Sequence, residues 1–116
     1  MGRKKRRISS GTASVLQVFL GDLSARRYGL ELIRLTGLPS GSLYPILIRL
    51  ETQGILRSDL EDERVAKGEG RRPRCYYRIS KQGEQQARHD LLEWHNAMSK
   101  RSLHGLATDV ATAMQC

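Results

Sequence analysis

Apolar residues recur at helical spacing in three successive segments of the first half of the chain. The first segment begins at Thr12, the second follows Arg26 and stops at Gly37, and the third runs from Ser40 to Gly54. In the third segment the apolar positions fall at i, i+3, i+4 and i+7. Residues at this spacing form one face of an amphipathic helix. The pattern therefore predicts three helices, and a tight turn joins the last two.

The third predicted helix carries its own boundary signals. Ser40 is a good N-cap residue, and Pro45 is tolerated only within the first turns of a helix. Both features indicate a start between Ser40 and about Ser42. Two short helices joined by a tight turn are typical of a helix-turn-helix, in which the second helix enters the DNA major groove.

The middle of the chain changes from helical to strand-like patterning. Residues 55–60 and 75–79 are rich in apolar and aromatic side chains, and the polar stretch 61–73 between them contains Gly68 and Gly70. Short runs of this kind on either side of a glycine-containing loop predict a hairpin. We expect a hairpin with a long, flexible tip, which is a wing.

A last helix is expected after Ser80, which is placed to cap it. Its small and apolar positions, Gly83, Ala87, Leu91, Trp94 and Met98, recur as in a coiled-coil seam. A single apolar stripe on an exposed helix requires a partner. The stripe changes phase beyond Ser99, and we expect the helix to break near Gly105 or a little before it.

These elements predict a mainly α protein with a small β-hairpin (α+β), namely a winged helix-turn-helix with a C-terminal dimerisation helix. The chain of 116 residues is short enough for one core. We divide it into a basic flexible arm (1–10), the winged helix-turn-helix DNA-binding domain (11–80), the dimerisation helix (81–100) and a tail with a short helix (101–116).

The charge balance points to nucleic acid as the partner. Lys and Arg number 20 against 12 Asp and Glu, for a formal net charge of +8. Such a surplus favours binding to polyanions. The cations gather in two clusters, one at residues 3–7 and one at residues 67–74 of the predicted wing.

Several other classes of protein find no support in the sequence. No stretch reaches the roughly 20 apolar residues that span a bilayer, and no signal-peptide core follows the basic N-terminus, so we expect a cytoplasmic protein. Cys75 and Cys116 are too few for a disulfide framework and are expected to be reduced and passive. His89 and Glu93 have the spacing of a metal-binding pair but no third ligand, so we expect no metal and no cofactor. No catalytic constellation can be assembled, which argues against an enzyme.

Three blocks of residues, in this order and spacing, carry a resemblance to a known family. They are Tyr28-Gly29, then Gly41-Ser-Leu-Tyr-Pro-Ile-Leu-Ile-Arg-Leu-Glu51 with Gly54-Ile-Leu56, then Arg71-Arg-Pro-Arg-Cys-Tyr-Tyr-Arg-Ile-Ser-Lys-Gln-Gly83. The chain resembles the PadR family of bacterial transcriptional regulators over residues 12–98. The arm (residues 3–7) and the tail after Ser99 depart from the family pattern.

The resemblance implies more than the residues alone do. It implies a homodimer, joined through the C-terminal helix, that represses genes from a palindromic operator and that in many members is released by ligands or stress. The short length is similar to that of a small subgroup with one C-terminal helix, some members of which bind flat aromatic drugs between subunits.

Candidate DNA contacts fall in three places. We expect contacts from the third helix, where Tyr44 could instead belong partly to the core, and from the wing, where a merely solvated charge run is the alternative. The arm could lie in the minor groove or give only nonspecific affinity. The candidates are Ser40, Ser42, Tyr44, Arg49, Lys67, Arg71, Arg72, Arg74, Arg3, Lys4 and Lys5.

The predicted dimer interface consists of apolar residues from the first and last helices: Val15, Phe19, Leu91, Trp94 and Met98. Packing between subunits is the default role of Trp94. The family resemblance adds a candidate effector pocket at the same residue. The partners we expect are therefore double-stranded DNA, a second copy of the chain and a small-molecule effector, with no membrane.

Two other functions remain open at this point. The winged helix could be a protein-docking module, since a fold alone does not fix function. It could also be an architectural or nonspecific DNA-binding protein that relies on its arm, which would show a steep salt dependence and little sequence preference.

Overall fold

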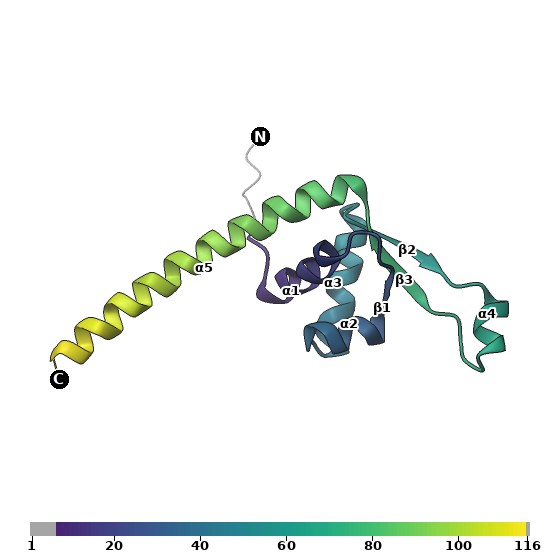
Figure 1. The fold of residues 1–116 in the computed structure, drawn as a ribbon, viewed down its shortest axis with the longest axis horizontal. Helices are drawn as coiled ribbons and strands as arrows, with labels where there is room; N and C mark the ends of the chain where they lie inside the picture. The colour runs from purple at the N-terminus through teal and green to yellow at the C-terminus, as the bar shows by residue number, and fades with distance from the viewer. Residues whose placement is uncertain (1–6, 116) are drawn as a thin grey trace.

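The computed structural model describes residues 7–115, and the side chains of residues 7–100. Within this range the elements, labelled in Figure 1, are α1 (Ser10–Gly21), β1 (Arg27–Tyr28), α2 (Gly29–Thr36), α3 (Ser40–Thr52), β2 (Leu56–Leu60), α4 (Glu63–Gly68), β3 (Cys75–Ile79) and α5 (Lys81–Gln115). The predicted fold class, mainly helical with a small antiparallel sheet, is confirmed.

One core joins the first three helices to the sheet and to the start of α5. It consists of Val15, Leu16, Phe19, Leu32, Leu43, Ile46, Leu47, Leu50, Ile55, Leu56, Tyr77, Ile79 and Ala87. Val15 and Phe19 are both 0 % exposed in this single chain. Their assignment to the dimer interface was therefore wrong, because these two side chains present no surface to a partner and stabilise the monomer instead.

The predicted helix-turn-helix is present as α2 and α3. Gly37 ends α2 in the left-handed region at φ 74°, and its N–H donates to the carbonyl of Ile33 at 2.9 Å. The chain turns through Pro39, which occupies the N-cap position of α3. Ser40 is thus the first helical residue rather than the cap, and α3 begins two residues earlier than the position of Pro45 suggested.

The sheet has three antiparallel strands in the order β1-β3-β2. The predicted hairpin pairs Leu56 with Ile79 and Leu60 with Cys75. The edge strand β1, which was not predicted, pairs Tyr28 with Tyr76. Alternate side chains of β3 face opposite sides of the sheet. Tyr77 and Ile79 are buried toward the helices, and Arg78 is exposed on the outer face.

The tip of the wing is ordered, although the sequence predicted a flexible loop. The short helix α4 begins after Asp62, whose carboxylate accepts a hydrogen bond from the backbone N–H of Arg64 at 2.8 Å. Ala66, in the middle of α4, is fully buried. Gly70 then turns the chain back toward β3 at φ 70°.

The helix α5 starts on the core and then leaves it. Ser80 caps it as predicted, since its hydroxyl accepts from the N–H of Gly83 at 2.8 Å and donates to the carbonyl of Gly54 at 2.7 Å. Helical backbone then continues without interruption to Gln115. The predicted break near Gly105 was wrong, so no helix end coincides with the expected boundary at residue 100. At 1.5 Å per residue α5 is about 50 Å long, and most of it extends away from the body (Figure 1).

Candidate nucleic-acid interface

The helix α3 exposes the residues that the sequence nominated for DNA contact. Ser40, Ser42, Tyr44 and Arg49 are all exposed, while the opposite face of α3 supplies Leu43, Ile46, Leu47 and Leu50 to the core. Among the described residues no side-chain partner binds the guanidinium of Arg49. Its five N–H donors are therefore available to a base edge or a phosphate.

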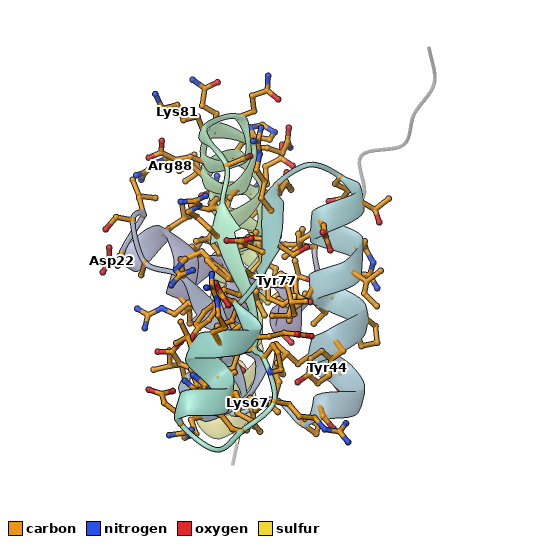
Figure 2. All side chains as sticks on the ribbon, turned by 90° about the vertical axis from the view of Figure 1, so that its right-hand side faces the viewer. Asp22, Tyr44, Lys67, Tyr77, Lys81 and Arg88 are labelled. Atoms are coloured by element: carbon orange, nitrogen blue, oxygen red, sulfur yellow. The ribbon has the colours of Figure 1, made fainter. Side chains whose placement is uncertain are left out.

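Tyr44 lies between two elements rather than fully in solvent. Its side chain is 41 % exposed, and its hydroxyl is in close contact with Gly29 at the start of α2, where an added Cβ would lie 2.2 Å from that oxygen. Tyr44 therefore belongs partly to the body of the chain, and its contact with DNA stays a prediction. One edge of the ring packs against the helix-turn-helix, and the rest stays accessible at the end of α3 (Figure 2).

A polar seam connects α3 to the sheet. The hydroxyl of Ser58, on β2, donates a short hydrogen bond to the carboxylate of Glu51, on α3. Next to it Tyr77 is buried under α3, and this burial raises the pKa of its phenol to about 12, with further contributions from Cys75, Glu51 and Tyr44. Tyr77 is therefore neutral at any ordinary pH, and the seam links α3 to the β2 strand of the hairpin.

Arg71 holds the wing tip together. Its guanidinium donates to both carboxylate oxygens of Glu61, through Nη2 at 2.9 Å and Nη1 at 2.5 Å, and its Nε donates to Glu69 at 3.0 Å. The side chains of Arg71 and Glu61 are only 22 % and 11 % exposed. The hydrogen bond from Arg71 is the main reason that the pKa of Glu61 falls from 4.5 to about 2. Arg71 was predicted to contact DNA, but its donors are directed at these two carboxylates.

The guanidinium of Arg74 is also engaged, on the outer face of the sheet. It stacks 4.1 Å from the ring centre of Tyr28, and Arg26 stacks in the same way 4.4 Å from Tyr76. The two tyrosines meet edge to face at 5.7 Å. The pKa of Arg74 is raised, first of all by hydrogen bonding to Tyr76. Sequence reasoning did not nominate Arg26, Tyr28 and Tyr76, because the two-residue strand β1 gives no periodic signal and so nothing indicated which residues lie beside Tyr76.

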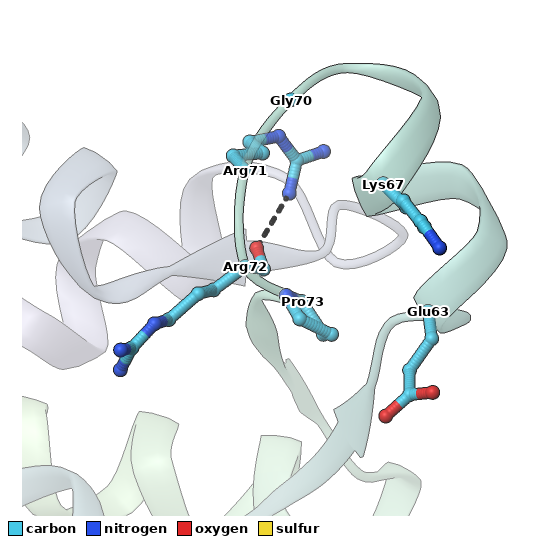
Figure 3. A pocket seen from close by; sticks show the side chains of 6 residues that line it. All are labelled: Glu63, Lys67, Gly70, Arg71, Arg72 and Pro73. Atoms are coloured by element: carbon cyan, nitrogen blue, oxygen red, sulfur yellow. Dashed lines mark hydrogen bonds between the residues drawn. The ribbon is translucent and has the colours of Figure 1, made fainter.

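Of the four wing cations nominated from the sequence, Lys67 and Arg72 stay available. Both are exposed, and their charged groups have no partner among the described residues. They line a hollow of about 430 Å³ at the wing tip together with Glu63, Gly70, Arg71 and Pro73, in which the side chain of Arg72 points away from Lys67 (Figure 3). The predicted basic cluster therefore divides into two residues that shape the wing and two that can reach outward.

Most of the basic arm, including Arg3, Lys4 and Lys5, lies outside the described residues. The first described residue, Arg7, lines a hollow of about 290 Å³ with Glu93, Asn96, Ala97 and Lys100 of α5. The chain therefore enters α1 beside α5, on the side of the body away from the wing tip (Figure 1).

The predicted seam of α5 has two parts. Its first residues, Gly83 and Ala87, are buried in the core of the chain itself. Leu91, Trp94 and Met98 are half-buried, and Leu92 beside them is 60 % exposed. Trp94 packs edge to face on His95, with ring centres 5.1 Å apart. Trp94 lines neither of the two hollows described above.

The described residues contain neither a metal site nor a membrane-spanning helix. His89 contacts Glu93 at 3.2 Å, but no group of three or more His, Cys, Asp or Glu side chains in the described part of the chain is placed to hold a metal ion. Nor does the described part contain a helix with the length and hydropathy needed to cross a bilayer.

A three-helix body with an exposed second helix of a helix-turn-helix, and a hairpin beside it, defines the winged helix-turn-helix class. Within that class, the profile of the transcriptional regulator PadR-like family matches residues 22–89, which is more than half of the chain. The chain belongs to this family. It is a DNA-binding transcriptional regulator and not an enzyme.

Solved structures agree on the fold. A PadR family transcriptional regulator from Eggerthella lenta is 25 % identical, with a TM-score of 0.60 over 79 % of this chain and 81 % of that one. A PadR-like transcriptional regulator from Bacillus cereus is 22 % identical, with a TM-score of 0.56 over 83 % and 89 %. The circadian clock associated protein Pex from Anabaena is 24 % identical, with a TM-score of 0.55 over 79 % and 83 %. No curated protein sequence matches significantly.

Proposed function

We propose that this regulator is a repressor that binds an inverted-repeat operator as a homodimer, with α3 in the major groove and the wing on the adjacent backbone. The observation that carries the proposal is the common placement of two exposed groups. Tyr44 at the start of α3 and Lys67 at the wing tip lie toward the same end of the molecule (Figure 2). One face of a DNA duplex can therefore meet both of them.

Each proposed contact follows from the chemistry of its side chain. Ser40 and Ser42 can donate to phosphates at the start of α3, and Arg49 can make a bidentate contact with guanine. Tyr44 offers its accessible edge, while Lys67 and Arg72 offer charge to the backbone. Arg71 and Arg74 contribute by giving the wing its shape. We assign Arg3, Lys4 and Lys5 to the phosphates that flank the site.

The proposed dimer is joined through α5. Leu91, Trp94 and Met98, together with the exposed Leu92, form an apolar stretch on a long helix that the rest of the chain covers only in part. A second copy of the same helix is the simplest cover for it, because most homo-oligomers are twofold dimers with self-complementary interfaces. Two copies related by a twofold axis require an operator with inverted half-sites.

Trp94 is also the proposed site of effector action. It shares the proposed interface with Leu91 and Met98, so a flat aromatic molecule between subunits would stack on it and shift the relative position of the two helices. The measurement is tryptophan fluorescence of the dimer during titration with planar aromatic compounds. Because Trp94 is the only tryptophan in the chain, any quenching reports on this site.

The function is tested by selecting bound sequences from a random duplex library at physiological salt, with the wild type and with Arg49→Ala. We expect the wild type to enrich an inverted repeat, and Arg49→Ala to relax one position by about 1–3 kcal/mol. No enrichment, with binding that fades uniformly as salt rises and that disappears when residues 1–8 are deleted, would instead establish an architectural role. Absence of DNA binding at any salt would favour protein docking.

The dimer is tested by sedimentation at micromolar concentration. Leu91→Glu combined with Trp94→Glu places two carboxylates in the proposed apolar interface and should give monomers. Gln82→Glu combined with Gln85→Glu adds the same charge at exposed positions of the same helix and should leave the dimer intact. A monomeric wild type contradicts this part of the proposal.

A further inference from the structure

The outermost line of α3 contains residues that none of the DNA contacts above uses. Gly41, Pro45, Ile48 and Thr52 follow one another at i, i+4, i+7 and i+11, and all four are exposed. At 100° per residue their mean direction is opposite to that of the buried stripe Leu43, Ile46, Leu47 and Leu50. This outer ridge is therefore the part of α3 that reaches deepest into any groove the helix enters.

The outer ridge has almost no hydrogen-bonding capacity. Gly41 has no side chain, and Pro45 carries neither a polar group nor a backbone N–H. The hydroxyl of Thr52 donates to the backbone carbonyl of Ile48 at 2.8 Å. What the outer ridge presents to a partner is consequently the Pro45 ring, the Ile48 side chain and the Thr52 methyl group. The most prominent of these, Ile48, is 61 % exposed.

The neighbouring lines of α3 have different chemistry. On one side Tyr44 contacts Gly29 of α2 and Glu51 contacts Ser58 of β2, so both face other elements of the chain. On the other side Arg49 carries the free guanidinium, about 100° around the helix from Ile48. Ile48 and Arg49 therefore reach different base pairs, and only the base pair under Ile48 meets an apolar surface.

One base edge in the major groove has an apolar group to match such a surface. Thymine presents its 5-methyl group there, while the edges of guanine, adenine and cytosine present donors and acceptors that an isoleucine would leave unpaired. We propose that Ile48 is a specificity-determining residue that reads the 5-methyl group of a thymine in each half-site. This inference rests on the proposed function, since it needs α3 to be the recognition helix.

The experiment replaces each thymine of the selected operator, one symmetric pair at a time, with deoxyuridine. This substitution removes the methyl group and leaves the hydrogen-bonding edge unchanged. For the wild type we expect one thymine position whose replacement weakens binding about fourfold per half-site, which corresponds to one buried methyl group. Ile48→Ala should bind the thymine and deoxyuridine operators equally well at that position.

Arg49→Ala provides the matched control, because it removes a neighbouring α3 side chain that reads a different base. It should weaken binding overall and keep the wild-type penalty for deoxyuridine. Both substituted residues are exposed, and circular dichroism should show unchanged helix content. If Ile48→Ala retains the full penalty, or if the wild type shows none at any thymine of a well-defined operator, the inference is wrong while the proposed function stands. Failure of the wild type to select any operator would overturn both.

Discussion

The helix α3 and the wing both contain cations that suit DNA, but they use these charges differently. In α3, Arg49 is exposed and has no internal partner in the described part of the chain. In the wing, Arg71 binds Glu61 and Glu69, and Arg74 stacks on Tyr28. Of the four wing cations that the sequence nominated for DNA contact, only Lys67 and Arg72 extend outward.

The difference arises from how each region acquires its shape. A helix satisfies its own backbone, and its apolar stripe fixes it on the core, so outer side chains such as Arg49 can serve a ligand. A hairpin tip of about a dozen residues buries little apolar area and needs polar contacts to hold one conformation. A count of cations in such a segment therefore overestimates the charge that is available for binding.

The largest expected effect is on stability, and it comes from disturbing the contact of α5 with the connection between α3 and β2, which supports both α3 and the wing. A Cβ on Gly83 would lie 2.2 Å from the backbone oxygen of Ile55, the residue that connects α3 to β2. Gly83→Ala should therefore lower the free energy of unfolding by about 3 kcal/mol, measured by denaturant titration. Gly21→Ala, where nothing lies within 4 Å, should change it by less than about 0.5 kcal/mol. Equal stability of the two variants would mean that α5 does not pack tightly against Ile55.

A smaller loss of stability is expected at the contact between α2 and α3. Gly29→Ala places a methyl group against the ring and hydroxyl of Tyr44 and should cost about 1–2 kcal/mol of stability, with Tyr44 displaced. Tyr44→Phe in the same chain should restore part of the loss, because it removes the nearest atom. Thermal melting of the two single variants and the double variant measures the coupling. Strict additivity would contradict the contact.

Within the wing, Arg71 and Arg72 form a matched pair of neighbours with different roles. Arg72→Ala should weaken DNA binding about threefold and lower the salt slope by about one, since it removes a proposed phosphate contact. Arg71→Ala should weaken binding about tenfold, because the wing must then be ordered on binding. The backbone N–H of residue 71 donates to the carbonyl of Ala66. Its hydrogen exchange should accelerate in Arg71→Ala, and also when Glu61 is substituted. Identical salt slopes and identical exchange in the two arginine variants would contradict the structural role.

The smallest effect is a response of the wing to acid. Because the pKa of Glu61 is lowered from 4.5 to about 2, its ion pair with Arg71 stabilises the wing above pH 4.5. That contribution is lost as the pH falls from about 4.5 toward 2. The amide signal of Gly70 in NMR spectra should shift over this interval and α3 signals much less, while Glu61→Gln should abolish the response. A shift centred at the ordinary carboxyl pKa would contradict the pairing.

Most of the fold could be predicted from the sequence, because residues such as glycine and serine have characteristic roles at helix ends. Gly37 ends α2 and Ser80 caps α5 for the reasons that predicted them. The strand β1 could not be predicted, because Arg27 and Tyr28 form a strand only by pairing with β3. The continuity of α5 through Gly105 was missed because a change in apolar phase alters which face is apolar without breaking the backbone.

The parts of the candidate site that depend on neighbouring residues in the sequence could be predicted, and the parts that depend on distant residues could not. Helical periodicity correctly separated the exposed residues of α3 from the buried ones. It could not reveal that Glu61, ten residues before Arg71, would take up that guanidinium. Nor could an apolar stripe distinguish a side chain used within the chain from one left for a partner. Val15 and Phe19 were therefore assigned to the dimer interface, although the core of the monomer contains them.

The seam from Glu51 to Ser58, with Tyr77 buried beside it, has a consequence for which DNA sequences are acceptable. It connects α3 to the hairpin, the two elements that we propose to contact DNA. If this connection keeps α3 and the hairpin at one spacing on DNA, the duplex has to supply the adjustment by bending or by changing its groove width. The energy of that deformation depends on the flexibility of base steps. We therefore expect operator preference to extend to base pairs between the two contact points, which no side chain touches.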